Sequence, residues 1–212
     1  MSTNHVITVS LLILLFLVTL AFVLYKKKAL LMLRALFSTR YLQQLFREGK
    51  FSNERIYLYP VLLFALSFPS LLLVFFLFYA PPSFMAFSPL LIYFLAFGGI
   101  VAIMLLSHLC LRFFTTIFNY QEQRYLHSTI KAIYRFYNAL FLIILVTVIW
   151  YARLPQLIFF AYFPLLLMIF LAYLILFLRN INVASRIHFF IYFCTLEILP
   201  YLLLVKLLVI NI

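Results

Sequence analysis

The sequence predicts an all-α membrane protein, in which a bundle of six transmembrane helices carries one interfacial amphipathic helix on its cytoplasmic side. Hydrophobic residues make up 68% of the 212 residues and charged residues only 9%, whereas soluble domains are roughly half apolar and a quarter charged. Apolar stretches of about 20 residues, the length that crosses a bilayer, recur along the chain. Lysines and arginines gather between alternate stretches. We therefore treat residues 1–212 as a single integral membrane domain.

The first predicted span covers residues 6–25, which contain no charged residue. Lys26, Lys27 and Lys28 follow it directly, while no lysine or arginine precedes it. Because positive flanks stay in the cytoplasm, the end at Tyr25 is predicted to be cytoplasmic and the N-terminus to lie on the opposite side. A cleavable signal peptide carries its positive charges before the apolar stretch, so this segment is not of that form.

An amphipathic helix is predicted over residues 35–48, within the basic segment that follows the first span. At 100° per residue its apolar side chains, among them Tyr41, Leu42 and Leu45, gather on one arc and its polar side chains on the other. The first interpretation places this helix in the inner-leaflet interface, with its arginines near lipid phosphates. The second makes it a docking helix, either for a partner or for the protein's own bundle.

The second and third spans are predicted over residues 56–80 and 89–114. Pro69 lies in the middle of the second span, where it removes a backbone hydrogen bond and is expected to kink the helix. Gly98 and Gly99 are adjacent within the third span. Since small residues let helices approach closely, we expect a packing contact there.

A polar connector at residues 119–131 leads to three further spans, predicted over 133–151, 157–178 and 188–210. Six spans place both termini on the same, non-cytoplasmic side. Of the 16 lysines and arginines, only Arg153 and Lys206 then lie on the outer side. This asymmetry satisfies the positive-inside rule and predicts that both termini lie on the non-cytoplasmic side.

Glu197 is the strongest candidate for a chemical role, because it is a carboxylate near the middle of the sixth apolar stretch. A carboxylate there must be protonated, paired or exposed to a wet cavity. Pro200 follows three residues later and frees the carbonyl of Leu196 from helical bonding. Glu197 is therefore either a proton-titratable or ligand-binding carboxylate, or a buried structural glutamate bonded across the bundle.

Other polar residues are weaker candidates. His108 either lines a cavity near Glu197 or is a satisfied interior histidine, and Asn138 is a candidate interhelical hydrogen-bonding residue. Seven cations are expected at the lipid headgroups of the cytoplasmic leaflet, which makes an anionic bilayer surface the predicted partner: Lys26, Lys27, Lys28, Arg34, Arg40, Arg47 and Arg112.

Several function classes are not indicated by the sequence. The positive charges flank apolar stretches instead of forming a continuous stripe, so nucleic acid is not an expected partner. Cys110 and Cys194 lack metal-ligand spacing, and histidines at matched depth for a haem are missing, so we expect no metal and no cofactor. The chain has no P-loop, no GxSxG and no HExxH motif, and we assign no catalytic residue.

The last predicted span contains the sequence Tyr192-Phe193-Cys194-Thr195-Leu196-Glu197-Ile198-Leu199-Pro200. This aromatic-rich helix resembles the closing helix of an uncharacterised family of multi-span inner-membrane proteins, a domain of unknown function found mainly in Bacteroidota. The basic stretch from Leu36 to Asn53 and the pair Tyr137-Asn138 are also similar to that family. The resemblance covers most of the chain. It implies the architecture and a location in the bacterial cytoplasmic (inner) membrane, where both termini would be periplasmic, and it supplies no activity.

Two functions are compatible with these features, and a third is less favoured. The first is an interaction or assembly subunit of a cell-envelope complex, with a protein partner in the membrane. The alternative is a small transporter or permease that uses an intramembrane site at Glu197 and His108, near the prolines of three spans. The third is a membrane enzyme that acts on a lipid-linked substrate through Glu122, Arg124 or His127.

Overall fold

The part of the chain that the computed structural model describes consists of helices with a few flanking residues. It comprises residues 3–35, 38–47, 57–79, 88–117 and 121–153, together with helical positions 164–165, 167–168, 171–172 and 175. Its helices are α1 (Thr3–Ala35), α2 (Thr39–Arg47), α3 (Leu58–Tyr79), α4 (Pro89–Ile117) and α5 (Gln121–Ala152). No strand occurs in these ranges, which agrees with the predicted all-α class.

Four helical segments are long and apolar enough to cross a membrane: His5–Ala35, Leu58–Phe78, Pro89–Phe113 and Leu126–Ala152. The chain is therefore a membrane protein of several apolar helices. The described helices do not support the predicted count of six spans. The sixth, at 188–210, lies outside the described residues, as does most of the fifth, at 157–178.

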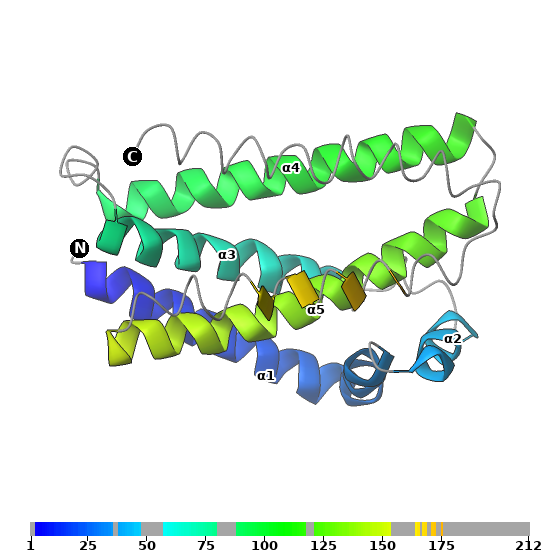
Figure 1. Cartoon of the computed structure of the whole chain (residues 1–212), viewed down its shortest axis with the longest axis horizontal. Helices are drawn as coiled ribbons and strands as arrows, with labels where there is room; N and C mark the ends of the chain where they lie inside the picture. The colour runs from blue at the N-terminus through cyan, green and yellow to red at the C-terminus, as the bar shows by residue number, and fades with distance from the viewer. Residues whose placement is uncertain are drawn as a thin grey trace.

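The long helices run back and forth through one bundle (Figure 1). The N-terminus, the end of α3, the start of α4 and the end of α5 lie at one end of the bundle. The end of α1, the whole of α2, the end of α4 and the start of α5 lie at the other. Helix α3 packs against α1, α4 and α5, so it is the element around which the other spans are arranged.

Helix α1 extends ten residues beyond the predicted span, which ended at Tyr25. The backbone at Tyr25 is not helical (φ −131°, ψ 37°), so α1 consists of two helical stretches joined by a kink. After the kink, Ala29 and Met32 are buried while Lys26 and Arg34 are exposed. The kink thus lies where the uncharged stretch ends and a stretch with one apolar and one basic face begins.

Helix α2 is shorter than the amphipathic helix predicted over 35–48. Ala35 is instead the last residue of α1, and Ser38 precedes α2 in a non-helical conformation. Leu42 and Leu45 are each 1% exposed, α2 packs against α1, and the Arg34 guanidinium lies 5.7 Å from the centre of the Tyr41 ring. These contacts fit the second interpretation, docking onto the protein's own bundle, and a location in the lipid interface stays a prediction.

The side of α4 that packs in the bundle does not include the two glycines that were expected to make a helix–helix contact. Ile100, Met104, Ser107 and Leu111 are buried, and their spacing of three and four residues defines a single face. Gly98 and Gly99 are exposed, and a Cβ built on either would meet no atom within 4 Å. The prediction that these glycines make a helix–helix contact is therefore wrong for the described residues, because both lie away from that face.

Helix α5 begins twelve residues before the predicted start of the fourth span. The segment 119–131 was expected to be a connector, yet from Gln121 onward it forms the first turns of α5. These turns contain no glycine or proline, and their Gln, Glu and Arg residues are good helix formers. His127, Ser128, Thr129 and Ile130 are buried, so the polar turns belong to the folded bundle.

Side-chain hydroxyl groups connect the first three spans near Pro69, through which α3 continues without interruption. The Ser70 hydroxyl lies 3.3 Å from the Ser10 hydroxyl of α1 and 3.0 Å from the Leu66 carbonyl. The Tyr93 hydroxyl of α4 donates to the same carbonyl at 3.1 Å. Pro69 lacks an N–H and so leaves the Ala65 carbonyl without its helical donor, while the two hydroxyl groups approach the carbonyl of the next residue, Leu66.

We predict that Tyr93→Phe lowers the free energy of unfolding by about 0.6–1.7 kcal/mol, the range found for interhelical hydrogen bonds in membranes. Because Tyr93 and Ser70 donate to one carbonyl, the loss in the double variant with Ser70→Ala should exceed the sum of the single losses. Reversible unfolding in mixed micelles measures both effects.

Thr19→Ala is the matched control, since the exposed Thr19 hydroxyl donates only to the Leu15 carbonyl of its own helix, at 2.8 Å. Its unfolding free energy should change little. Equal losses in Thr19→Ala and Tyr93→Phe would contradict an interhelical role for Tyr93.

Candidate functional site

A row of polar side chains runs along the first half of α5. His127, Lys131, Arg135 and Asn138 are spaced by four, four and three residues, which at 3.6 residues per turn places them within an arc of about 80°. His127 is 0%, Asn138 1% and Arg135 8% exposed, and Lys131 is half-buried. The arc therefore faces the interior of the bundle.

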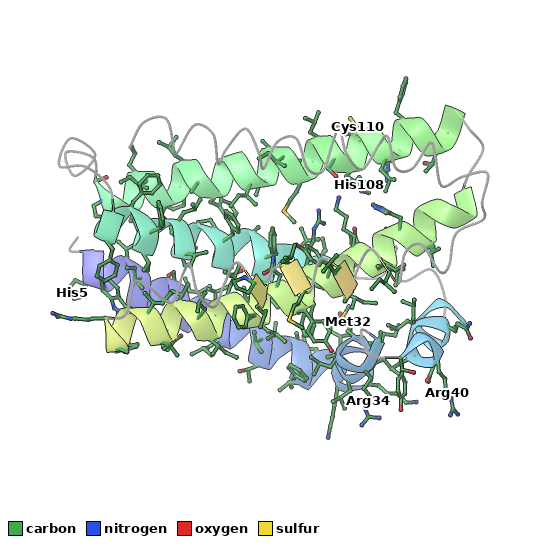
Figure 2. All side chains as sticks on the ribbon, viewed as in Figure 1. His5, Met32, Arg34, Arg40, His108 and Cys110 are labelled. Carbon is green, nitrogen blue, oxygen red and sulfur yellow. The ribbon has the colours of Figure 1, made fainter. Side chains whose placement is uncertain are left out.

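Helix α4 contributes polar groups opposite this row. The Lys131 ammonium donates to the hydroxyl of the buried Ser107 at 2.6 Å, a direct bond between α5 and α4. The next residue, His108, lies on the side of α4 that faces α5 (Figure 2). We call this group the α4–α5 polar cluster, and its members are Ser107, His108, His127, Lys131, Arg135 and Asn138.

The depth of the cluster follows from the length of α5. A bilayer core needs about 20 helical residues, and twenty residues counted back from Ala152, the end of α5, start at Ile133. Lys131 then lies just outside the apolar stretch and Arg135 just inside it. All the α5 members of the cluster lie within the apolar segment Leu126–Ala152, and this count leads us to expect them near the level where the hydrocarbon meets the headgroups.

Positive charge dominates the described side chains of the cluster. The protein has four acidic residues, Glu48, Glu54, Glu122 and Glu197, and the structure describes none of their side chains. Within the described residues, Arg135 has no hydrogen-bond or ion-pair partner, and the buried Asn138 Oδ1 has no hydrogen-bond partner either. Buried polar groups of this kind are costly unless something satisfies them.

A further polar contact fixes the rotation of α5. The Tyr137 hydroxyl donates to the backbone carbonyl of Leu33 in the last turns of α1, and the Phe136 ring lies 6.3 Å from the Phe22 ring of α1. These residues hold one side of α5 against α1. The side that carries Lys131 and Asn138 is thereby turned toward α3 and α4.

Two of the residues predicted to form an intramembrane site lie in the same cluster. His108 and Asn138 both belong to the α4–α5 polar cluster, although they were selected separately. Glu197 and Pro200 lie outside the described residues, and the Arg47 side chain does too. The remaining predicted headgroup cations lie at the same end of the bundle as the cluster, and all but the half-buried Lys28 are exposed: Lys26, Lys27, Lys28, Arg34, Arg40 and Arg112.

Sequence reasoning missed Ser107, Lys131 and Arg135 as site residues. Lys131 was placed in the predicted connector at 119–131 and Arg135 at the start of the predicted span at 133–151, and both were counted only as cytoplasmic positive charges. The signal was present in the spacing of residues 127, 131, 135 and 138, which defines one helical face once the helix is extended to Gln121. In the described part of the chain, no three His, Cys, Asp or Glu residues come together in a way that could hold a metal ion.

Comparison with known proteins decides the family. The model of the family described as Domain of unknown function (DUF4271) matches residues 7–208. The chain belongs to this family. The match includes all the described helices except the first four residues of α1, and it includes the final stretch that contains Glu197, so the resemblance to this family is confirmed. No curated protein and no solved structure matched the chain. The DUF4271 description assigns no activity, and a function must be argued from the residues.

Proposed function

We propose that this DUF4271 protein spans a bacterial cytoplasmic membrane six times, with both termini in the periplasm. One end of the described bundle carries the basic residues of α1, α2, α4 and early α5, while the exposed Arg153 follows α5 at the opposite end. Under the positive-inside rule the basic end faces the cytoplasm. The predicted spans at 157–178 and 188–210 then return the C-terminus to the side of the N-terminus.

Thiol labelling of spheroplasts tests this orientation. In a background with Cys110→Ala and Cys194→Ala, we expect His5→Cys and Arg153→Cys to react with a membrane-impermeant maleimide. Arg40→Cys should react only after permeabilisation, because cytoplasmic thiols are shielded. Alkaline phosphatase fused after Ile212 should be active, since it folds in the periplasm. The reverse labelling pattern would refute the orientation, and an inactive fusion would refute an even number of spans.

Its proposed role is that of an interaction subunit in a cell-envelope complex. The observation that carries this role is the outward face of α4, where Gly98 and Ala102 are exposed four residues apart. This is the small-xxx-small spacing that lets transmembrane helices approach closely. Exposed leucines surround the pair, among them Leu95, Leu106 and Leu109.

The occupant that fits this face is a transmembrane helix of another protein. Glycine inside a helix costs about 1 kcal/mol relative to alanine. If only lipid covered this face, a larger side chain would pack against the lipid chains equally well, and the glycine would bring no advantage. A partner helix does gain, because backbone approach at Gly98 and Ala102 increases van der Waals contact. The small residues are thus accounted for by a partner that packs on them.

Photo-crosslinking in native membranes tests the partner. A photo-reactive amino acid in place of Leu106 should give a product heavier than the protein itself, and Ala102→Leu should abolish that product without loss of the protein. The control is the same amino acid in place of Val23, a lipid-facing position of α1 that is 73% exposed. A product only at the mass of the single chain would contradict the assembly role, since another segment of this chain would then cover the face.

A second candidate function is a small transporter or permease, and the α4–α5 polar cluster is what favours it. Polar and charged groups at membrane depth are expensive and are typical of substrate or ion pathways. In this hypothesis Glu197 supplies a titratable carboxylate at the predicted midpoint of the last span, and Pro69, Pro164 and Pro200 loosen the backbone of three spans.

We expect Glu197→Gln to abolish complementation of a deletion strain while the protein still accumulates in the membrane. Glu48→Gln, which neutralises a carboxylate in the basic segment before the second span, should complement normally. If Glu197→Gln instead prevents accumulation, the glutamate is structural and the permease hypothesis loses its titratable group. Quantitative immunoblotting of membranes separates these results.

A further inference from the structure

The α4–α5 polar cluster contains a cation that must be compensated. The guanidinium of Arg135 stays protonated in proteins, so burial cannot be relieved by loss of its charge. It is 8% exposed and has no hydrogen-bond or ion-pair partner within the described residues. No counter-ion for this largely buried charge occurs among the described side chains, and such a charge is costly without one, which favours an anionic partner outside them.

The neighbouring groups indicate which anion fits. Asn138 follows Arg135 by three residues on the same face and is 1% exposed, and its unpartnered atom is the acceptor Oδ1. Rotation of the side-chain amide by half a turn exchanges Oδ1 for Nδ2, whose two N–H groups can donate to an anion. Lys131 precedes Arg135 by four residues, and its ammonium, which bonds Ser107, has three donors in total. The Arg135 guanidinium, the Lys131 ammonium and the Asn138 amide together provide several donors, which suit a phosphate group with its several acceptor oxygens.

The position of the cluster also favours phosphate. The apolar stretch of α5 is expected to start at Ile133, between Lys131 and Arg135, so the cluster is expected near headgroup level. Exposed cations surround this end of the bundle, including Arg34, Arg40 and Arg112. These cations attract anions to the surface within a Debye length. The buried cluster differs from them because the surrounding helices hold its hydrogen-bond donors in fixed positions.

We propose that the α4–α5 polar cluster binds one phosphate group, with Arg135 and Lys131 as charged donors and Asn138 as a neutral donor. The phosphate belongs either to the headgroup of an anionic phospholipid of the cytoplasmic leaflet or to a soluble phosphate compound. This site goes beyond the assembly role, which depends on the opposite face of α4.

The experiment uses the full chain in micelles of dodecyl maltoside, a detergent without a phosphate group. In one arm phosphatidylglycerol is added to the micelles and retained lipid is counted by native mass spectrometry. In the other arm inorganic phosphate is added without lipid and binding is followed by equilibrium dialysis. Retention of one phosphatidylglycerol without binding of free phosphate identifies a headgroup site, and saturable binding of free phosphate identifies a site for a soluble compound.

In the arm that binds, Arg135→Gln should weaken binding about tenfold or more, as expected for loss of a charged hydrogen bond. Arg135→Lys should restore part of the affinity, because it keeps the charge. Arg153→Gln is the matched control, since it removes one exposed positive charge outside the cluster, and its affinity should equal that of the unchanged protein.

Asn138→Asp keeps the test decisive if Arg135→Gln fails to fold. This nearly isosteric change supplies an internal carboxylate beside Arg135, so it should abolish phosphate binding while the melting temperature stays equal or rises. The proposal is overturned if the unchanged protein binds neither probe. It is equally overturned if Arg135→Gln and Arg153→Gln bind alike, or if Asn138→Asp binds as tightly as the unchanged protein.

Discussion

Hydrocarbon offers no hydrogen-bond partners, and this constraint governs the structure at each level. Backbone N–H and C=O groups in a span must be satisfied within the protein, which is why the described spans are helical. The same constraint extends to side chains. Ser10, Thr19, Thr115 and Thr147 donate to carbonyls of their own helices, and Ser70 and Tyr93 approach one carbonyl beside Pro69. The exceptions to this pattern lie in the α4–α5 polar cluster.

The bundle is asymmetric along its length as a result. The half that contains the N-terminus has neutral hydroxyl groups that join its helices without charge, as Ser70 and Tyr93 do. The basic half contains Lys131 and Arg135, a buried asparagine, and a surface of exposed lysines and arginines. The proposed phosphate site lies in this basic half because the charged donors are there.

The two faces of α4 serve different purposes in this scheme. One face places Met104, Ser107 and Leu111 in the bundle and brings His108 toward α5. The other exposes Gly98 and Ala102 among leucines. An interaction role and a phosphate site can therefore coexist in a single DUF4271 protein, because they use opposite sides of one helix. Helix α2 docks on α1 through Leu42 and Leu45, at the same end of the bundle as the proposed phosphate site.

The sequence by itself determined the helical membrane class, the approximate position of four spans, the family and the end of the bundle at which the basic residues gather. These properties depend on local composition, since about 20 apolar residues cross a bilayer whatever surrounds them. It also selected His108 and Asn138. Only the tertiary structure decided that residues 121–131 continue α5, that α2 packs on α1, and that Gly98 and Gly99 face outward. The tertiary structure also identified Lys131 and Arg135 as site residues. In the sequence, a charged residue beside an apolar stretch looks the same whether its side chain is exposed to water or faces the interior of the bundle. Which of these occurs is set by packing against neighbouring helices, and that packing depends on residues far apart in the chain.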